Sequence, residues 1–471
     1  MSHGNYLYDE ISIGQEATAV RVCTANDLVV FAHASGNLNP MHIPELDGDG
    51  DGQPEAVAPS MWLGSLFSAV LGNVMPGIGT LYRRQDLRFY DRAHIGDEIE
   101  VTIKVREKRP AGVIVFDCMC RARDGRLLAD GEAEVLAPER KIILPAHQIP
   151  ELLVQRHVHF DRLMRACDHV EPLPTAVVAP EDDVSLGGPI LAYQRGLIRP
   201  VLIGDATRIR AAAVEHGLDI SALQIIDIED HEQAAARAVG LVHEGQVQAV
   251  MKGNLHSDQL LSQVAKRDGG LRTSRRMSHV FVLDVPGSPD PLLVSDAAIN
   301  IAPDLEAKVD IVQNAIDMAL ALGMVKPRVG VLSAVETVNT KIPSTLDAAV
   351  LSKMAERGQI KGGIVDGPLA MDNAIDMDAA QTKGIQSLVA GQAQVLIAPN
   401  LEAGNMMAKE LTFIAHAEAA GLVLGTKVPV MLTSRADDEK ARLVSCALAQ
   451  LYDAWKATGR SPVADLPAGL G

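Results

Sequence analysis

Aromatic residues are scarce in this chain of 471 residues, which has 7 Phe, 2 Trp and 6 Tyr. Proteins that bind single-stranded nucleic acid stack the bases on aromatic rings, and so few rings argue against such a platform. Basic residues are also in the minority: 43 Lys and Arg stand against 60 Asp and Glu, and the net charge is −17. We therefore expect neither the broad basic surface of a nucleic-acid-binding protein nor a nucleic-acid partner.

Cysteines and long apolar runs are scarce as well. An odd, scattered set of 5 cysteines is not a disulfide framework. No apolar run approaches the ~18 residues of a membrane span, and MSHGNYLYDE lacks the basic start and apolar core of a signal peptide. The run Asp47–Gly52 imitates a calcium loop, but its twelfth position holds Ala58 instead of Glu. We expect a cytoplasmic protein with no membrane association and no bound metal.

The pattern of the chain changes near residue 150. Before it, one apolar helix, Met61–Leu71, precedes several segments with strand character, which predicts an α+β sheet wrapped around a helix. Prolines between Pro138 and Pro150 indicate a linker. We therefore predict one domain, with its linker, over 1–150 and a second over 151–471. The predicted strands are Thr80–Phe89, Glu98–Val105, Val113–Arg121 and Arg126–Val135.

After residue 170, short apolar strands alternate with helices. One helix is predicted over 304–322, with Asp304 as its N-cap and Gly323 as its stop. This alternation favours α/β structure with a mostly parallel, doubly wound sheet. About 300 residues exceed one core, which predicts two subdomains with a cleft. The predicted strands are Thr175–Val178, Val201–Ile203, Ala249–Met251, Val280–Leu283, Val329–Leu332, Gly363–Val365, Val395–Ile397 and Val428–Leu432.

Residues suited to binding phosphate gather around these strands. In doubly wound sheets, ligands bind beyond the carboxyl ends of the strands. Small residues, amides, hydroxyls and single cations are what a phosphate pocket needs there. The candidates are Lys252, Gly253, Asn254, Arg276, Ser278, Lys341, Asp366, Asn405, Ser434, Arg435 and Asp437.

Several of these segments resemble the phosphate acetyl- and butyryltransferases. The resemblance covers about residues 155–465 and is carried by KGNLHSDQLL, SDAAINIAPDLE, LSAVETVNTKIPSTLDA, GGIVDGPLAMDNA, LIAPNLEAGN and PVMLTSRADD. It implies two subdomains of the type shared with isocitrate dehydrogenases. It also implies acyl transfer between coenzyme A and inorganic phosphate, with an acyl-CoA thioester and phosphate as substrates and no covalently bound cofactor.

The resemblance also suggests roles for individual residues. The coenzyme A thiolate attacks an acyl phosphate directly, so no nucleophilic Ser or Cys is required. Arg435 holds phosphate and stabilises the oxyanion, while Ser434 bonds the carbonyl oxygen. Asp437, or else Asp438, takes the thiol proton. Lys252, Arg276 and Lys341 bind phosphate groups. An oxidoreductase of the isocitrate-dehydrogenase type, the alternative, needs a cluster of metal-binding aspartates and a nucleotide loop that the sequence does not show.

The stretch Phe31–His42, FAHASGNLNPMH, resembles the signature of MaoC-like, R-specific enoyl-CoA hydratases, which have the hotdog fold. PGIGT at 76–80 and QDLRFYDRAHIGDEIEV at 85–101 support it, over about residues 10–140. That family uses an Asp and a His five positions apart. Here His42 is present, but Asn37 replaces the Asp, and an amide is no base at neutral pH.

Three functions remain open for this domain: a weakened hydratase, an acyl-CoA-binding module without turnover, or a thioesterase. For the whole chain, the non-enzymatic alternative is an acyl-CoA sensor that has lost both activities. Because hotdog domains commonly pair, the resemblance also implies a homo-oligomer.

Overall fold

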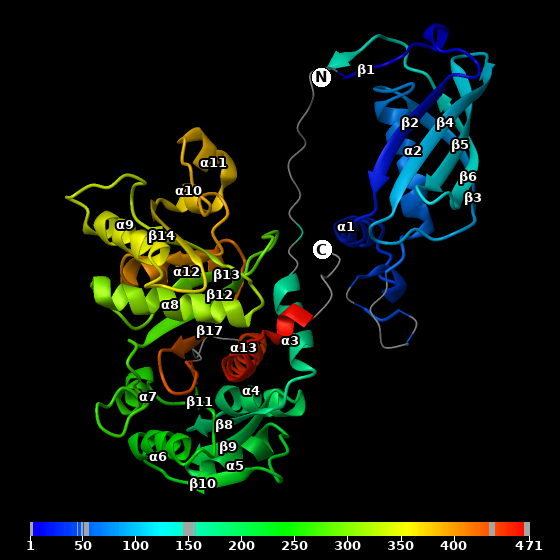
Figure 1. Ribbon diagram of the computed structural model, residues 1–471. Helices are drawn as coiled ribbons and strands as arrows, with labels where there is room; N and C mark the ends of the chain where they lie inside the picture. Colours follow the sequence, from blue (N-terminus) through cyan, green and yellow to red (C-terminus); the bar gives the residue numbers. More distant parts are fainter. Residues whose placement is uncertain are drawn as a thin grey trace. The chain divides into compact units, whose positions relative to one another are not determined.

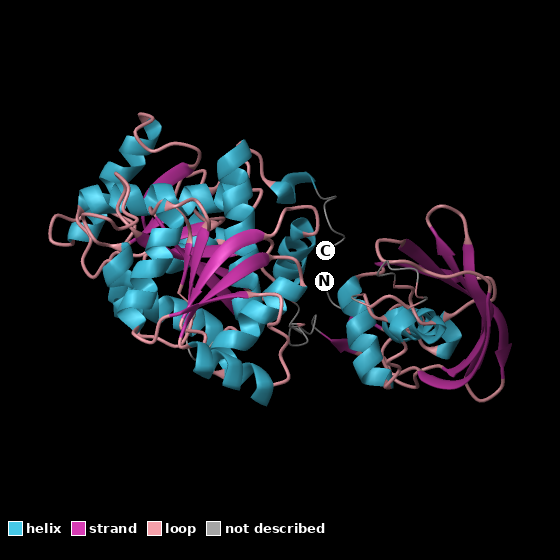
Figure 2. Ribbon diagram, turned by 90° about the horizontal axis from the view of Figure 1, so that it is seen from below, coloured by secondary structure: helices cyan, strands magenta, loops and turns pink. Residues whose placement is uncertain are grey.

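The computed structural model describes residues 3–44, 46–48, 50, 56–144, 154, 157–432 and 439–465 (Figures 1 and 2). The chain divides into two compact units, which we call unit 1 (Met1–Val154) and unit 2 (Gln155–Gly469). Each unit has its own sheet and its own hydrophobic core. Among the described residues, no helix combines the length and the apolar character that crossing a bilayer requires.

Unit 1 is an antiparallel five-stranded sheet that curves around helix α2, Ser60–Asn73 (Figures 1 and 2). The helix carries no charged residue, and Trp62, Leu63 and Phe67 are among the side chains it buries. This agrees with the predicted sheet wrapped around a helix. In sheet order the strands are β2 (Glu16–Val22), β4 (Glu98–Arg109), β5 (Val113–Ala122), β6 (Leu127–Leu136) and β3 (Leu81–Phe89).

The alternation along β4 and β5 matches the prediction of half-buried strands. On β4, Ile99 and Val101 are buried while Glu100 between them is exposed. On β5, Cys118 and Cys120 both face the core. Such a period of two is what a sheet with one covered face requires.

Unit 1 also holds elements that the sequence did not predict. A second helix, α1 (Ala25–Ser35), is capped by Thr24, whose side chain accepts a hydrogen bond from the Asp27 amide. Short strands β1 (His3–Gly4) and β7 (Ile143–Leu144) pair antiparallel, so the first part of the predicted linker is a strand. Two short 3-10 helices span Tyr8–Glu10 and Pro40–His42.

Unit 2 contains one continuous sheet of eleven strands. Its first five strands are mutually parallel, and so are its last four. In sheet order the strands are β10 (Gln224–Asp227), β9 (Ile198–Gly204), β8 (Leu173–Val178), β11 (Ala249–Lys252), β18 (Val430–Met431), β17 (Glu418–Leu424), β12 (Ser278–Asp284), β13 (Leu292–Ser295), β16 (Val395–Ile397), β14 (Arg328–Leu332) and β15 (Ile364–Leu369).

The mostly parallel pairing agrees with the prediction, and a single sheet runs through the whole of unit 2. Strand β17 pairs antiparallel with both β18 and β12, and β12 pairs antiparallel with β13. These antiparallel strands join the two parallel blocks into one mixed sheet. The sequence did not predict β17 or β13, so the joint between the blocks was missed.

Helices pack on both faces of this sheet (Figure 1). Helix α8 (Leu305–Ala321) confirms the predicted helix: Asp304 caps it by accepting from the Ala307 amide, and Gly323 follows its end at φ +89°. The others are α3 (Val158–Cys167), α4 (Asp183–Gln194), α5 (Ala206–Glu215), α6 (His231–His243), α7 (Ser257–Val264), α9 (Pro343–Glu356), α10 (Met371–Ile375), α11 (Met377–Thr382), α12 (Leu401–Phe413) and α13 (Glu439–Thr458), with a 3-10 turn at Pro462–Asp465.

Candidate functional site

The carboxyl ends of β8 and β11 hold three of the predicted residues together. The Gly253 amide donates to the Val178 carbonyl oxygen over 2.8 Å, and the Asn254 amide donates to the Ala179 oxygen over 2.7 Å. A Cβ on Gly253 would lie 2.4 Å from the Val178 oxygen, so only glycine fits. Lys252 is buried beside them, and its Nζ lies 3.3 Å from the carbonyl oxygens of Gly253 and Leu255. An ammonium group is thus held at this edge of the sheet.

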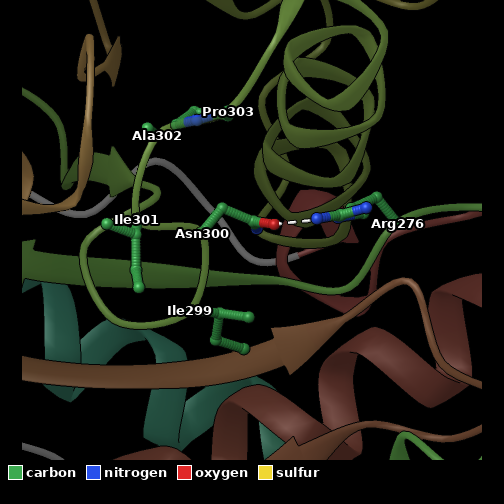
Figure 3. Close-up of a pocket in the computed structure, with 6 residues that line it drawn as sticks. All are labelled: Arg276, Ile299, Asn300, Ile301, Ala302 and Pro303. Carbon is green, nitrogen blue, oxygen red and sulfur yellow. Dashed lines mark hydrogen bonds between the residues drawn. The ribbon is translucent and has the colours of Figure 1, made fainter.

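A pocket of about 260 Å³ opens beside Arg276 (Figure 3). The Arg276 Nε donates to Asn300 Oδ1 over 3.0 Å, and its backbone amide donates to Asp310 on α8 over 2.8 Å. The terminal nitrogens of this exposed guanidinium have no partner among the described residues. Arg276 therefore has a fixed orientation and free donors for an anion. The pocket is lined by Arg276, Ile299, Asn300, Ile301, Ala302 and Pro303.

Asp296, which the sequence reasoning did not single out, organises the loop that forms this pocket. It is 2% exposed. Its Oδ1 accepts from the amides of Ala298 and Ile299, and its Oδ2 accepts from the amide of Asn300. The Asn300 Nδ2 donates to Asp296 Oδ2 over 2.6 Å and to the Met277 oxygen over 2.8 Å. These bonds leave the Asn300 oxygen for Arg276. Asp296 and Asn300 are polar residues that follow strand β13, and this is the signal that could have identified them. The sequence analysis did not predict β13, so both residues were missed.

Two further residues predicted to bind substrate, Ser278 and Asn405, make hydrogen bonds within unit 2. Ser278, inside β12, is fully buried, and its hydroxyl accepts from Asn314 Nδ2 over 2.9 Å. Asn405, on α12, donates from Nδ2 to the Ala297 oxygen over 3.1 Å, which ties the helix to the pocket loop. Neighbouring Gly404 permits this approach, since a Cβ there would lie 2.4 Å from the Asp296 oxygen.

The structure places Lys341 and Asp366 on other elements. Lys341 is exposed just before α9, and its ammonium makes no hydrogen bond or ion pair with the described residues. Asp366, on β15, accepts from the Gly367 amide over 2.8 Å and from the hydroxyls of Ser352 and Ser387. The Asp366 carboxylate is therefore occupied within the protein, whereas Lys341 is available to an anion.

Ser434, Arg435, Asp437 and Asp438 lie outside the described residues. The strand before them, β18, runs parallel to β11 with Met431 opposite Met251. Strands β18 and β11 therefore end at the same edge of the sheet.

The cysteine thiols are unsuited to nucleophilic chemistry. All five are buried. Burial raises the pKa of Cys118, Cys120 and Cys167 to about 12, and the pKa of Cys446 on α13 likewise. Because the thiolate is the nucleophile, these groups are inert at neutral pH.

In unit 1, the loop after α1 orients His42. Gly36 ends the helix at φ +70°. The His42 Nδ1 lies 2.7 Å from the Val57 carbonyl oxygen and must be the donor, so Nε2 carries the lone pair. Asn37 is exposed, and its Oδ1 accepts from the Asn39 amide over 3.3 Å. An imidazole acceptor and an amide are thus the polar groups that this loop offers.

Comparison with known proteins identifies both parts of the chain. Residues 231–450 match the family model "Phosphate acetyl/butaryl transferase", and residues 10–115 match "MaoC like domain". A phosphate acetyltransferase of Rhizobium meliloti is 58% identical over 295 residues, 63% of this chain and 93% of that protein. A phosphate butyryltransferase of Clostridium beijerinckii is 42% identical over 296 residues, 63% of this chain and 98% of that protein.

A solved structure agrees. The crystal structure of a branched-chain phosphotransacylase from Enterococcus faecalis matches with a TM-score of 0.52 and 30% identity, over 59% of this chain and 99% of that one. Together these findings confirm the resemblance seen in both parts. The chain belongs to the phosphate acetyl/butyryltransferase family and carries a MaoC-like domain at its N-terminal side.

Proposed function

We propose that unit 2 transfers acyl groups between coenzyme A and inorganic phosphate. The observation that carries this proposal is the 58% identity to a phosphate acetyltransferase over 93% of that protein's length. The pocket at Arg276 supports it, because its free guanidinium donors suit the oxygens of a phosphate group. Buried Lys252 adds a second cation at the carboxyl end of β11.

In the proposed reaction, the coenzyme A sulfur attacks the carbonyl carbon of an acyl phosphate. The carbon–sulfur bond forms, the carbon–oxygen bond to phosphate breaks, and phosphate leaves with the electron pair. The thiol proton passes to Asp437 or Asp438, while Arg435 and Ser434 stabilise the oxyanion. Lys252, Arg276 and Lys341 bind phosphate groups. The buried cysteines agree with direct transfer, since no covalent acyl-enzyme is needed.

We also propose that the two parallel blocks of the sheet act as two subdomains of the type shared with isocitrate dehydrogenases. The antiparallel joint at β17 and β12 supports this division. The working enzyme is proposed to be a cytoplasmic homo-oligomer that needs no covalently bound cofactor.

For unit 1, we propose a hotdog domain that takes acyl-CoA. The orientation of His42 Nε2 supports a base role in a hydratase, whereas Asn37 cannot supply the second proton-transfer group. A weakened hydratase, a binding module and a thioesterase remain the three candidates, and one experiment separates them.

The transferase is tested by mixing the full chain with phosphate and either acetyl-CoA or butyryl-CoA and following thiol release. Arg435→Ala is expected to lower the rate by roughly 10²–10³-fold, as loss of an oxyanion donor does. The matched control is Arg210→Ala, an exposed arginine on α5, which should keep the rate. An absence of thiol release with every acyl chain length would refute the proposal.

The same full chain, supplied with crotonyl-CoA and no phosphate, tests unit 1. Loss of the enoyl absorbance indicates hydration, thiol release indicates a thioesterase, and tight binding without either indicates a binding module. Asn37→Asp should raise hydration by ~10²-fold or more if the missing base limits the rate. No gain in a folded variant means that Asn37 does not explain the deficit.

A further inference from the structure

Three ligand-type side chains meet at one end of the central strands of unit 2. Asp284 ends β12, Glu418 begins β17, and the two lie directly opposite each other in the antiparallel ladder. His157 comes just before α3. One nitrogen or oxygen atom from each residue lies within 4.8 Å of the other two. The cluster belongs to neither proposed active site.

The two carboxylates are arranged unfavourably unless a cation joins them. Like charges directly opposite on neighbouring strands repel. Asp284 is 0% exposed; its Oδ2 accepts from the Phe160 amide over 2.8 Å, but its Oδ1 has no partner among the described residues. Glu418 Oε1 accepts from Lys440 over 2.8 Å, whereas its Oε2 is buried and unpartnered. Two buried carboxylate oxygens are thus left unsatisfied, which is costly.

His157 is oriented as a metal-binding histidine. Its Nδ1 lies 3.2 Å from the Asp284 backbone carbonyl oxygen, which can only accept, so Nδ1 is the donor. The lone pair is therefore on Nε2, which lies 3.9 Å from Glu418 Oε1. Metal-binding histidines commonly donate their other ring nitrogen to a carbonyl or carboxylate in this way.

We propose that His157 Nε2, Asp284 Oδ1 and Glu418 Oε2 bind one divalent transition-metal ion, such as Zn²⁺. One imidazole and two carboxylates suit zinc, and water completes the tetrahedron. Zinc bonds of about 2.0–2.2 Å place tetrahedral ligand atoms about 3.4 Å apart. One ligand atom from each residue lies within 4.8 Å of the other two, so binding shortens these separations by about 1.4 Å at most. With one lysine against two carboxylates, the cluster attracts a further positive charge.

The location of the site predicts a structural role for the ion. It joins the start of α3 to β12 and β17, and Lys440 extends the cluster to α13. Helices α3 and α13 pack against each other (Figure 1), with Cys167 Sγ 3.9 Å from the Ala447 oxygen. An ion that binds the folded chain and not the unfolded chain stabilises the folded state. The bound metal should therefore raise the melting temperature of unit 2.

The test is a titration of the full chain, stripped with EDTA and desalted, with Zn²⁺ alone. One Zn²⁺ per chain should bind, and the melting temperature should rise. His157→Gln and Glu418→Gln should each weaken Zn²⁺ binding by about tenfold or more. His159→Gln is the matched control, because His159 lies in the first turn of α3, two residues from His157, with its Nε2 2.9 Å from the Ser288 oxygen. This variant should bind Zn²⁺ as the unmodified chain does. Equal Zn²⁺ affinity in all of these variants would overturn the proposal.

A second variant keeps the test decisive if those substitutions disturb folding. Lys440→Gln removes the ammonium that competes for Glu418 and should tighten Zn²⁺ binding several-fold. Co²⁺ in place of Zn²⁺ should give visible absorption that His157→Gln alters. The alternative occupant is a proton shared by the two carboxylates. In that case Zn²⁺ leaves the melting temperature unchanged and Glu418→Gln raises it without metal, which would refute the metal site.

Discussion

At the scale of single residues, Gly253 determines how closely the β11 loop approaches β8. Its built Cβ lies 2.4 Å from the Val178 oxygen and 2.5 Å from the Ala179 oxygen. Gly253→Ala therefore forces the backbone apart, at a cost of about 1–3 kcal/mol in the free energy of unfolding. Because Lys252 moves with this backbone, thiol release should also fall, by ~10²-fold for a displacement of about 1 Å.

Urea unfolding and the thiol-release assay measure the two effects. Gly187→Ala is the control, because Gly187 lies on α4 with open space around the added Cβ. It should stabilise the chain by about 0.5–1 kcal/mol, since alanine is the better helix former. Unchanged stability in Gly253→Ala would contradict the contact.

His279 makes the stability of unit 2 depend on pH. Burial lowers its pKa from 6.5 to about 4, against the opposing effect of Asp296. The unfolded chain therefore takes up this proton first. The contribution of neutral His279 to the free energy of unfolding is complete above about pH 6.5 and is lost as the pH falls towards 4. Melting temperatures measured between pH 6.5 and pH 4 should decrease as the pH is lowered. His279→Gln should reduce this dependence of the melting temperature on pH.

The exposed histidine His216 provides the control for that measurement, because His216→Gln leaves the buried ring in place. The same slope in the His279→Gln variant and the unmodified chain would mean that other groups cause the pH dependence.

The sequence could predict only part of the site at this scale. Lys252, Gly253 and Asn254 follow a recognisable apolar strand, and the strand-end rule places them correctly at the edge of the sheet. The substrate-binding role of Ser278 stays a prediction, whereas its burial inside β12 and its hydrogen bond with Asn314 were not predicted. Burial of this kind depends on strand pairing, which residue type does not reveal.

At the scale of elements, the loop over residues 296–303 forms the Arg276 pocket around one carboxylate. Asp296 accepts hydrogen bonds from three successive amides and from the Asn300 side chain. Asp296→Ala removes these acceptors and should destabilise unit 2 by on the order of 2–4 kcal/mol. Asn300 then loses its fixed position, and with it the orientation of Arg276, so the KM for phosphate should rise by ~10-fold with a smaller change in kcat.

Steady-state kinetics over a range of phosphate concentrations test this positioning role. Asp304→Ala, which removes only the cap of α8, should cost about 1 kcal/mol and leave the KM for phosphate unchanged. An equal rise of the KM in both variants would indicate general loosening instead of a role for the loop.

The predictability of elements followed the strength of their local signals. Helix α8 has apolar residues at helical spacing, a cap and a terminal glycine, and it was found nearly to the residue. Helix α1 lacks so clear an apolar stripe and was missed. Strand β17 was missed as well, so the antiparallel joint of the sheet was not predicted. The pairing of Asp284 with Glu418, and the approach of His157, arise only from this tertiary joint: His157 and Asp284 are 127 residues apart.

At the scale of the whole molecule, the chain combines two units with separate cores. The core of unit 1 is drawn from residues between Ile11 and Ala137, and the cores of unit 2 from residues between Phe160 and Val463. The MaoC-like match, over residues 10–115, lies in unit 1, and the transferase match, over residues 231–450, lies in unit 2. Both proposed functions use coenzyme A thioesters, so on these proposals the two units would share a substrate class.

Separate cores predict that unit 2 works without unit 1. A chain comprising residues 157–471 keeps every side chain of the unit 2 cores, the Arg276 pocket and the proposed metal ligands. Its kcat/KM for acyl transfer should therefore lie within about twofold of the full chain's, because every residue proposed to take part in the reaction belongs to unit 2. Crotonyl-CoA binding, in contrast, should disappear from the shortened chain apart from weak binding at the transferase site. Thiol release and equilibrium dialysis measure the two quantities. A tenfold or greater fall in acyl transfer by a folded shortened chain would show that unit 1 supplies something to the transferase reaction, and the two units would then have to be treated as one catalytic machine.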